Sequence, residues 1–274
     1  MVEEEQTKIN PYNFNNKLLP VEFIVKVINK YGIHKLSDNL KSGENIAIYQ
    51  QAFIHSSYRR NEKLIEEVGI VDKPEGALDI YNYDYERLEF LGDSILGAIV
   101  ANYLYERYYN QNEGFLSVMK TKLVRKHALA YFSKELGFSE YIILSRHMED
   151  IHNGRSSIDI LEDTFEAFIG AMFLDYGTMG YEVCNEFLVN LLEEKVDFAE
   201  LIMTDTNYKG RLTKHYMKMY QHKLIFKQLE KNGTFIKMGV YNTDDKFIGE
   251  GIGNTKKTAE QNACKEILIT MDML

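Results

Sequence analysis

The hydrophobic pattern of the chain changes its period near residue 205, and this change limits the folds open to it. Before that point, apolar residues recur at three- and four-residue steps, the spacing of helices with one buried face. The helices predicted there cover residues 21–31, 46–58, 85–109, 115–136, 158–174 and 180–198. Beyond it, a helix over 207–221, three alternating stretches over 224–229, 235–241 and 246–252, and a helix after Thr255 are predicted. We therefore expect an all-α body followed by a small α+β domain of order α-β-β-β-α.

The length of 274 residues exceeds the usual size of a single domain. We expect an N-terminal tail over residues 1–20, an all-α domain over 21–199, a linker over 200–206 and the α-β-β-β-α domain over 207–274. Residues 59–84 are polar and contain glycine and proline, so they are predicted to form a long loop or insertion.

Composition excludes several classes of protein. The opening residues are acidic where a signal peptide would be basic, and no apolar run approaches the length of about 18 residues that a membrane span needs. We expect a soluble, intracellular, cytoplasmic protein with no membrane partner. Cys184 and Cys264 lie far apart and lack Cys-x-x-Cys spacing. This spacing fits a reducing compartment, excludes a cysteine-built zinc site and predicts that both are core residues.

Charge is divided unequally between the two predicted domains. The net charge of −9 argues, taken alone, against a nucleic-acid partner. From residue 205 onward, however, 12 Lys and Arg face 8 Asp and Glu, a net charge of +4, whereas residues 1–204 carry 20 against 33, a net charge of −13. This is the distribution expected of a basic nucleic-acid-binding module carried on an acidic body.

Two predicted helices carry carboxylates at helical spacing. Residues 86–94 read ERLEFLGDS, and helical geometry places Glu86, Glu89 and Asp93 within a sector of roughly 60°. Like charges at such positions repel by a few tenths of a kcal/mol per pair, so we expect a cation to offset them. Asp163 and Glu166 repeat the pattern in a second apolar helix. Acidic residues at this spacing are usually a solvated face, but two such helices without thiolate or imidazole partners favour a site for Mg²⁺ or Mn²⁺.

The opposite face of the first carboxylate helix is predicted to be core. Leu88, Leu91, Ile95 and Ile99 recur on it at three- and four-residue steps.

The last predicted helix starts with an unusual pair of lysines. Asn254 or Thr255 is the expected N-cap, and Lys256 and Lys257 follow in the first turn, where the helix dipole disfavours cations. The pair could be ordinary solubility charge. Together with the free N–H groups of a helix start, it would also form a phosphate clamp, which binds nucleic acid without reading its sequence.

Beyond residue 20, the chain resembles the ribonuclease III family, in which an endonuclease domain precedes one double-stranded-RNA-binding domain. The resemblance rests on ERLEFLGDS at 86–94 and DTFEAFIGA at 163–171, with weaker support from 51–58 and 123–130. It implies a metal-dependent endonuclease that acts on double-stranded RNA as a homodimer, in RNA processing or degradation, with Mg²⁺ and no small-molecule cofactor. The implied products carry 5′-phosphate and 3′-hydroxyl ends with short 3′ overhangs.

The resemblance also implies roles for individual residues. It matches six carboxylates to the family's acidic positions: Glu86, Glu89, Asp93, Glu113, Asp163 and Glu166. We expect catalysis and metal binding from Glu89, Asp93, Asp163 and Glu166, and substrate organisation from Glu86 and Glu113. The expected RNA contacts are Thr255, Lys256, Lys257 and Lys209, and Phe90 is the expected dimer contact, although it could also be a core residue. A non-catalytic protein that binds and sequesters double-stranded RNA is the alternative, and the six intact acidic positions favour cleavage over it.

The chain departs from the family pattern at four places. Tyr85 stands where asparagine is common before the first glutamate, and the 59–84 insertion has no counterpart in compact bacterial members. In the second domain, residues 232–235 lack the Gly-Pro-x-His loop that enters an RNA minor groove, and Thr213 and Lys214 replace a common Gln-Glu pair. We expect these differences to affect the fit of the substrate and not the chemistry.

Overall fold

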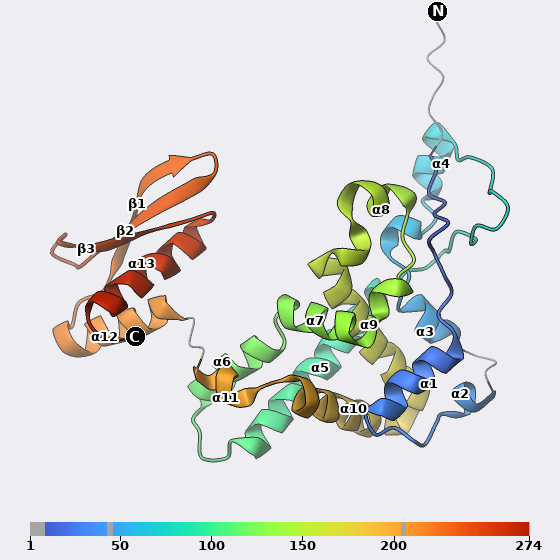
Figure 1. Ribbon diagram of the computed structural model, residues 1–274, viewed down its shortest axis with the longest axis horizontal. Coiled ribbons are helices and arrows are strands. Elements are labelled where there is room, and N and C mark those ends of the chain that lie inside the picture. The colour runs from blue at the N-terminus through green and yellow to red at the C-terminus, as the bar shows by residue number, and fades with distance from the viewer. Residues whose placement is uncertain (1–8, 43–45, 204–206, 274) are drawn as a thin grey trace, which may run out of the picture. The chain divides into compact units, whose positions relative to one another are not determined.

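The computed structural model describes residues 9–42, 46–203 and 207–273, and the chain forms two compact units, Met1–Asp197 and Phe198–Leu274 (Figure 1). Part of the expected linker is helical, because α11 covers Phe198–Met203 and belongs to the second unit. The rest of it, residues 204–206, lies outside the described residues, as do residues 1–8 of the expected tail. Within the described parts of the chain, no helix combines the length and apolar character that a membrane span requires.

The described part of the first unit contains helices and isolated β-bridges but no strand, so the prediction of an all-α body is confirmed. Its α-helices are α1 (Val21–Lys30), α2 (Asp38–Ser42), α3 (Ala47–Gln51), α4 (Glu62–Val68), α5 (Glu86–Arg107), α6 (Glu113–Leu123), α7 (Lys126–Leu136), α8 (Arg146–His152), α9 (Ile158–Tyr176) and α10 (Gly180–Lys195).

Several helix boundaries differ from the predicted ones. The stretch 115–136 is two helices, because Arg125 is extended (φ −71°, ψ 148°) between α6 and α7. The stretch 46–58 contains only α3 and a 3₁₀ turn that begins after His55, whose side chain accepts a hydrogen bond from the Ser57 N–H. The predicted loop over 59–84 contains α4, whose N-cap is Asn61. The spacing of apolar residues does not report local caps and turns of this kind.

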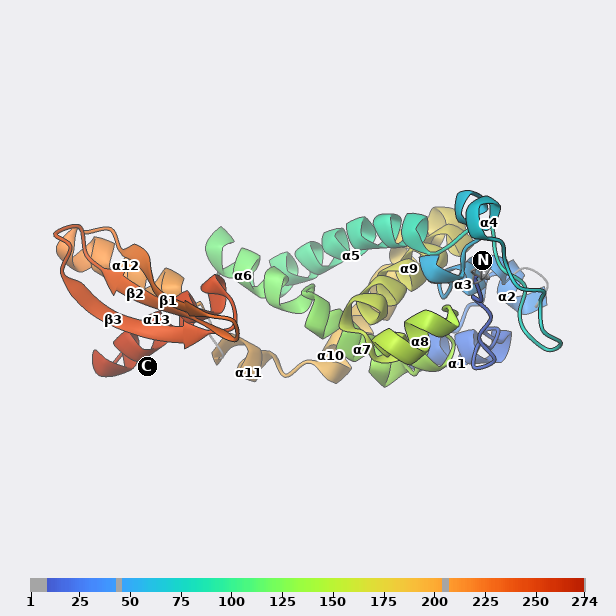
Figure 2. The same ribbon diagram turned by 90° about the horizontal axis from the view of Figure 1, so that it is seen from above.

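Helices α5 and α9 lie side by side in the first unit (Figures 1 and 2), and two glycines bring their backbones into contact. A Cβ atom at Gly92 would lie 1.7 Å from the carbonyl oxygen of Glu166, and one at Gly170 would lie 2.3 Å from that of Leu88. The expected core face of α5 is therefore only partly correct. Leu88 and Ile99 are buried, as expected, but Leu91 and Ile95 are half-buried, because α5 turns Gly92 toward its neighbour.

Helix α9 is the centre of this unit. Every residue from Thr164 to Met172 is buried, and α5, α7 and α10 all pack against it. Residues 167–172 of this helix are apolar on all sides, which is typical of a helix inside a core. Asp163 and Glu166 are thus carried by the most enclosed element of the unit.

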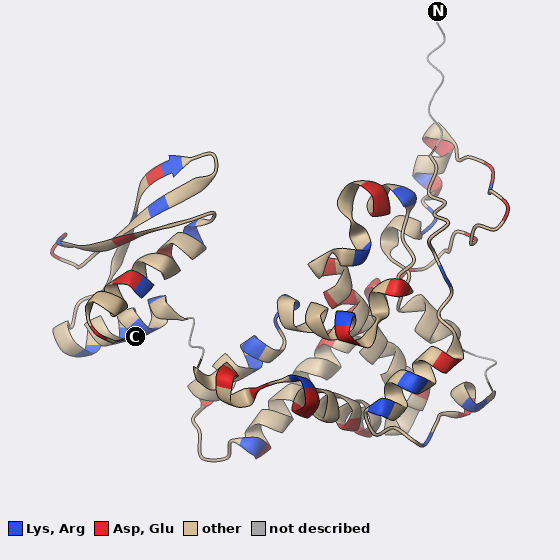
Figure 3. Cartoon of the chain, viewed as in Figure 1, with Lys and Arg blue, Asp and Glu red and all other residues tan. Residues whose placement is uncertain are grey.

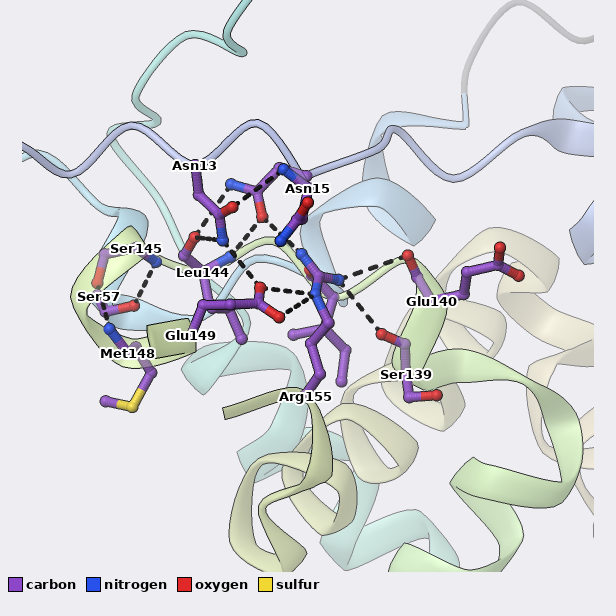
Figure 4. A network of polar contacts seen from close by, with 12 residues as sticks. Asn13, Asn15, Ser57, Ser139, Glu140, Leu144, Ser145, Met148, Glu149 and Arg155 are labelled. Atoms are coloured by element: carbon purple, nitrogen blue, oxygen red, sulfur yellow. Dashed lines mark hydrogen bonds and ion pairs between the residues drawn. The ribbon is translucent and has the colours of Figure 1, made fainter. Parts of the chain in front are cut away.

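Residues 10–20 of the expected N-terminal tail are attached to the first unit (Figure 4). The side-chain amides of Asn13 and Asn16 donate to the carbonyl oxygen of Leu144 at 3.2 and 3.0 Å. Arg155 donates to Asn16 Oδ1 at 3.0 Å and pairs with Glu149 at 2.7 Å. Polar bonds to the Leu144 carbonyl and the burial of Tyr12 and Leu19 together attach this segment.

After α11, the second unit has the predicted α-β-β-β-α order. Its elements are α12 (Tyr208–Tyr220), β1 (Ile225–Asn232), β2 (Phe235–Tyr241), β3 (Phe247–Gly253) and α13 (Lys256–Thr270). The three strands form one antiparallel sheet in the order β1-β2-β3, and α13 packs on β2 and β3. A Cβ at Gly251 would lie 2.2 Å from the backbone nitrogen of Ala263, so this glycine allows the close approach of α13. The core comprises Leu212, Val240, Ala263, Cys264, Ile267 and Leu268.

Candidate active site and nucleic-acid interface

The carboxylates of the site begin at the N-terminus of α5. Asp84 precedes the helix and accepts a hydrogen bond from the Glu86 N–H at 3.1 Å, and Arg59 forms an ion pair with it at 2.9 Å. Glu86 and Glu89 lie in the first turn. Negative side chains are favourable there, because the helix dipole presents its positive end. The fold therefore offsets part of the repulsion that their spacing creates.

The contact between α5 and α9 brings two sets of carboxylates together. Burial raises the pKa of Glu166 to about 8, and the negative charges of Asp93, Glu162, Glu89 and Asp163 add to this shift. Burial likewise raises the pKa of Glu89 to about 7, with Asp163 as the strongest of its acidic neighbours. These mutual effects place the carboxylates of both helices in one electrostatic cluster.

Glu162 belongs to this cluster although the sequence did not single it out. Burial raises its pKa, and the carboxylates of Asp163 and Asp159 add to the shift, whereas the ammonium group of Lys126 opposes it. Lys126 forms an ion pair with Asp159 and lies 3.8 Å from Glu162. Lys126 therefore offsets negative charge on α9, and not on the α5 carboxylates for which the spacing predicts a cation. It comes from α7, far away in the sequence, so helical periodicity could not identify it.

The site fits a hard divalent cation. Its donors are carboxylate oxygens, which Mg²⁺ and Mn²⁺ prefer. Burial and, to a lesser degree, mutual repulsion raise the pKa values of Glu89 and Glu166, and a bound cation would favour their ionised forms. Within the described residues, no group of three acidic, histidine or cysteine side chains is arranged to hold a metal ion as it stands. Binding of an ion would therefore require carboxylates of the cluster to move toward it.

Glu113 does not join the cluster within one chain. It is the first residue of α6, beyond the C-terminal end of α5, and its carboxylate accepts a hydrogen bond from Ser117 at 2.7 Å. Helix α5 has 22 residues, which corresponds to a length of about 33 Å. The cluster lies at the other end of that helix.

Phe90 lies on α5 between Glu89 and Asp93, with 78% of its surface exposed. Phe90 is therefore not a core residue of a single chain. A single exposed apolar side chain is common on protein surfaces, so the exposure of Phe90 does not by itself assign a partner.

The expected phosphate clamp lies at the start of α13. Thr255 is the N-cap and accepts a hydrogen bond from the Thr258 N–H at 3.1 Å, and Lys256 and Lys257 are exposed in the first turn. Figure 3 shows Lys and Arg on the helices and strands of the second unit. Lys209 is placed differently, because it pairs with Glu260 at 2.6 Å and lies 4.2 Å from the ring centroid of Phe226. The ammonium group of Lys209 is therefore already partly neutralised within the second unit.

A family model described as Ribonuclease-III-like matches residues 45–195, more than half of the chain. The chain belongs to the ribonuclease III family. A second family model, the double-stranded RNA binding motif, matches residues 208–271. The first unit of this ribonuclease III therefore carries the endoribonuclease and the second carries the RNA-binding motif, as the resemblance predicted.

Relatives of this ribonuclease III occur in bacteria and viruses. Ribonuclease 3 of Leptospira interrogans is 33% identical over 81% of this chain and 83% of its own length. A probable ribonuclease 3 of Acanthamoeba polyphaga mimivirus is 27% identical over 96% of this chain, which spans only 48% of that longer protein. The crystal structure of the nuclease domain of the Campylobacter jejuni ribonuclease III is 24% identical, with a TM-score of 0.48, over 63% of this chain and 96% of that one.

Proposed function

We propose that this ribonuclease III hydrolyses phosphodiester bonds in double-stranded RNA with Mg²⁺ as its ion, Mn²⁺ serving as a substitute. The family is divalent-metal-dependent in general. The observation that carries the proposal here is the single carboxylate cluster formed where α5 and α9 touch. The proposed products have 5′-phosphate and 3′-hydroxyl ends with short 3′ overhangs.

Each carboxylate has a proposed role. Glu89, Asp93, Asp163 and Glu166 hold and orient the metal, and Glu86, which is exposed at the start of α5, organises the substrate. When bound, a divalent ion supplies an activated water and stabilises charge on the phosphoryl oxygens. The enclosed position of Glu166, only 8% exposed, limits the freedom of its side chain, so it presents its oxygens in a defined direction.

A homodimer would complete the site. Phe90 is exposed beside the cluster, and Glu113 lies at the far end of α5 from it. An isologous pair of antiparallel α5 helices would cover Phe90 and bring Glu113 of one chain toward the cluster of the other. Such a dimer carries two active sites, one for each strand of a duplex.

The second unit supplies affinity for the duplex. The acidic first unit repels a polyanion at long range, so favourable electrostatics come from the basic second unit and from bound metal. Thr255, Lys256 and Lys257 are proposed to contact phosphates at the start of α13, with Lys209 in a supporting role. Contacts of this kind follow the shape of A-form RNA and are insensitive to base sequence.

Cleavage of a long, perfectly paired RNA tests this proposal directly. Wild-type protein should cut it with Mg²⁺ and stop in excess EDTA, and mapping the ends should give 5′ phosphates and short 3′ overhangs. Glu166→Gln should abolish cleavage while duplex binding persists, because it removes one anionic metal ligand and leaves the second unit intact. The matched control is Glu182→Gln, the same change at an exposed position of α10.

Two results would refute the assignment. One is full cutting in EDTA, and the other is normal turnover by Glu166→Gln at modest Mg²⁺. Binding without cleavage under all metal conditions would support the alternative of a non-catalytic protein that sequesters RNA. No feature of the described residues favours that alternative.

A further inference from the structure

A tyrosine contacts one of the proposed metal ligands. The hydroxyl of Tyr85 donates a hydrogen bond to Asp163 Oδ2 at 2.9 Å. Tyr85 stands directly before α5, as the N-cap residue of that helix.

We propose that Tyr85 is a positioning residue for the metal site, which fixes the orientation of the Asp163 carboxylate through the hydrogen bond to Oδ2. This inference rests on the proposed function, because it assumes that Asp163 is a metal ligand. Carboxylate ligands are commonly hydrogen-bonded by neighbouring side chains that set their orientation.

Tyr85 cannot act by touching the RNA. Only 2% of its surface is exposed, and its ring lies edge-on to His55 with 5.7 Å between the ring centroids. Burial and the nearby Asp163 carboxylate raise its pKa above the ordinary tyrosine value. The hydroxyl therefore keeps its proton at neutral pH and acts as a donor.

The backbone that carries Tyr85 is held on several sides. Its N–H donates to the carbonyl oxygen of Ile54 at 2.9 Å, and its own carbonyl accepts from the N–H groups of Leu88 and Glu89 at 2.8 and 2.9 Å. Gln51 donates to the carbonyl oxygen of Asp84 at 2.9 Å. A side chain on such a fixed base can define the position of its partner.

The end of the 59–84 insertion contributes to this base. Asp84 is 5% exposed and is paired with Arg59, and the Arg60 N–H donates to the carbonyl oxygen of Tyr81 at 2.7 Å. Tyr58 Oη donates to the carbonyl oxygen of Leu78 at 2.9 Å. Both ends of the insertion are thus tied together next to α5. In this proposal, the insertion holds Tyr85 in position to form its hydrogen bond to Asp163.

Another tyrosine of the same unit provides a matched control. Tyr49 is fully buried, and its hydroxyl donates to Asp175 Oδ2 at 2.9 Å, the same distance as in the Tyr85–Asp163 pair. Asp175 lies at the end of α9 and is not among the carboxylates that shift the pKa values of Glu89 and Glu166. Tyr49→Phe therefore removes an equivalent bond without touching the proposed site.

The test measures Mn²⁺ binding to the metal-free full-length protein by electron paramagnetic resonance. Tyr85→Phe should raise the dissociation constant for Mn²⁺ by about 10- to 100-fold, the range found when such a partner of a metal ligand is removed. Tyr49→Phe should stay within about twofold of wild type. In cleavage assays, Tyr85→Phe should raise the half-saturating Mg²⁺ concentration, and saturating Mg²⁺ should return the rate close to the wild-type value.

The outcomes separate this inference from the proposed function. If wild type shows no saturable Mn²⁺ binding that Asp163→Asn removes, the proposed metal site itself is wrong. If wild type binds Mn²⁺ and Tyr85→Phe binds it within twofold of wild type, only the inference about Tyr85 is overturned. If Tyr85→Phe does not fold, Gln51→Ala is measured instead, because it removes the hydrogen bond to the Asp84 carbonyl directly before Tyr85. An unchanged Mn²⁺ affinity in that variant refutes the inference.

Discussion

The carboxylate cluster should make the metal-free protein less stable as pH rises. The carboxyl of Glu166 keeps its proton in the folded protein up to about pH 8, whereas in the unfolded chain it loses its proton near pH 4.3. Between these values, the folded state holds about one more proton than the unfolded state, so the free energy of unfolding falls by about 1.4 kcal/mol per pH unit. From pH 6 to pH 8, Glu166 alone accounts for a loss of about 2 to 3 kcal/mol.

Thermal melting in EDTA at pH 6 and pH 8 measures this loss. For a unit of this size, it corresponds to a fall in Tm of about 5 to 10 °C. Glu166→Gln cannot ionise at this position, so it should show a clearly smaller fall, whereas the surface control Glu182→Gln should follow wild type. Millimolar Mg²⁺ at pH 8 should raise the Tm of wild type more than that of Glu166→Gln, because binding to the folded state stabilises it. An equal fall in wild type and Glu166→Gln would refute the raised pKa of the buried Glu166 carboxyl.

Three further predictions concern other parts of the molecule. Gly92→Ala should lower the stability of the first unit by about 3 kcal/mol in urea unfolding, because its Cβ would overlap the backbone of α9; a change below about 0.5 kcal/mol would contradict the contact. Phe90→Ala should weaken the dimer in sedimentation, and a wild-type chain that is monomeric at tens of micromolar, a range in which such interfaces close, would speak against the proposed pairing. Lys256→Ala/Lys257→Ala should weaken binding to unrelated RNA duplexes alike and reduce the salt slope of log K by roughly one to two, and an unchanged slope would exclude the clamp.

The two-domain fold was predictable because its signal is periodic. Three- and four-residue steps indicated the helices of the first unit, and alternation indicated the sheet of the second. The start of α5 and the N-cap at Thr255 also followed from local sequence. The attachment of residues 10–20 was not predictable, because the side chains of Asn13 and Asn16 bond to a distant carbonyl, and such hydrogen bonds leave no periodic trace.

The site was predictable only in part. Spacing identified the acidic stripe on α5 and the pair on α9, and the structure brings these carboxylates together. It could not identify Lys126 or the bond from Tyr85 to Asp163, because both depend on contacts between separate elements. Gly92 was missed as the contact point for a related reason. A residue without a side chain adds nothing to a hydrophobic pattern, yet it allows the closest approach of two helices.

The burial of α9 divides the site into two parts that should open at different rates. Amide hydrogens on a helix enclosed by three others exchange with solvent only when the whole unit unfolds. Asp163 and Glu166 lie on that helix, whereas the Glu86 side chain is exposed in the first turn of α5. The exposed carboxylates of α5 can therefore move while their partners on α9 stay in place. In deuterium exchange, α9 should be the last helix of the unit to lose its protection, and metal should slow exchange chiefly at the start of α5.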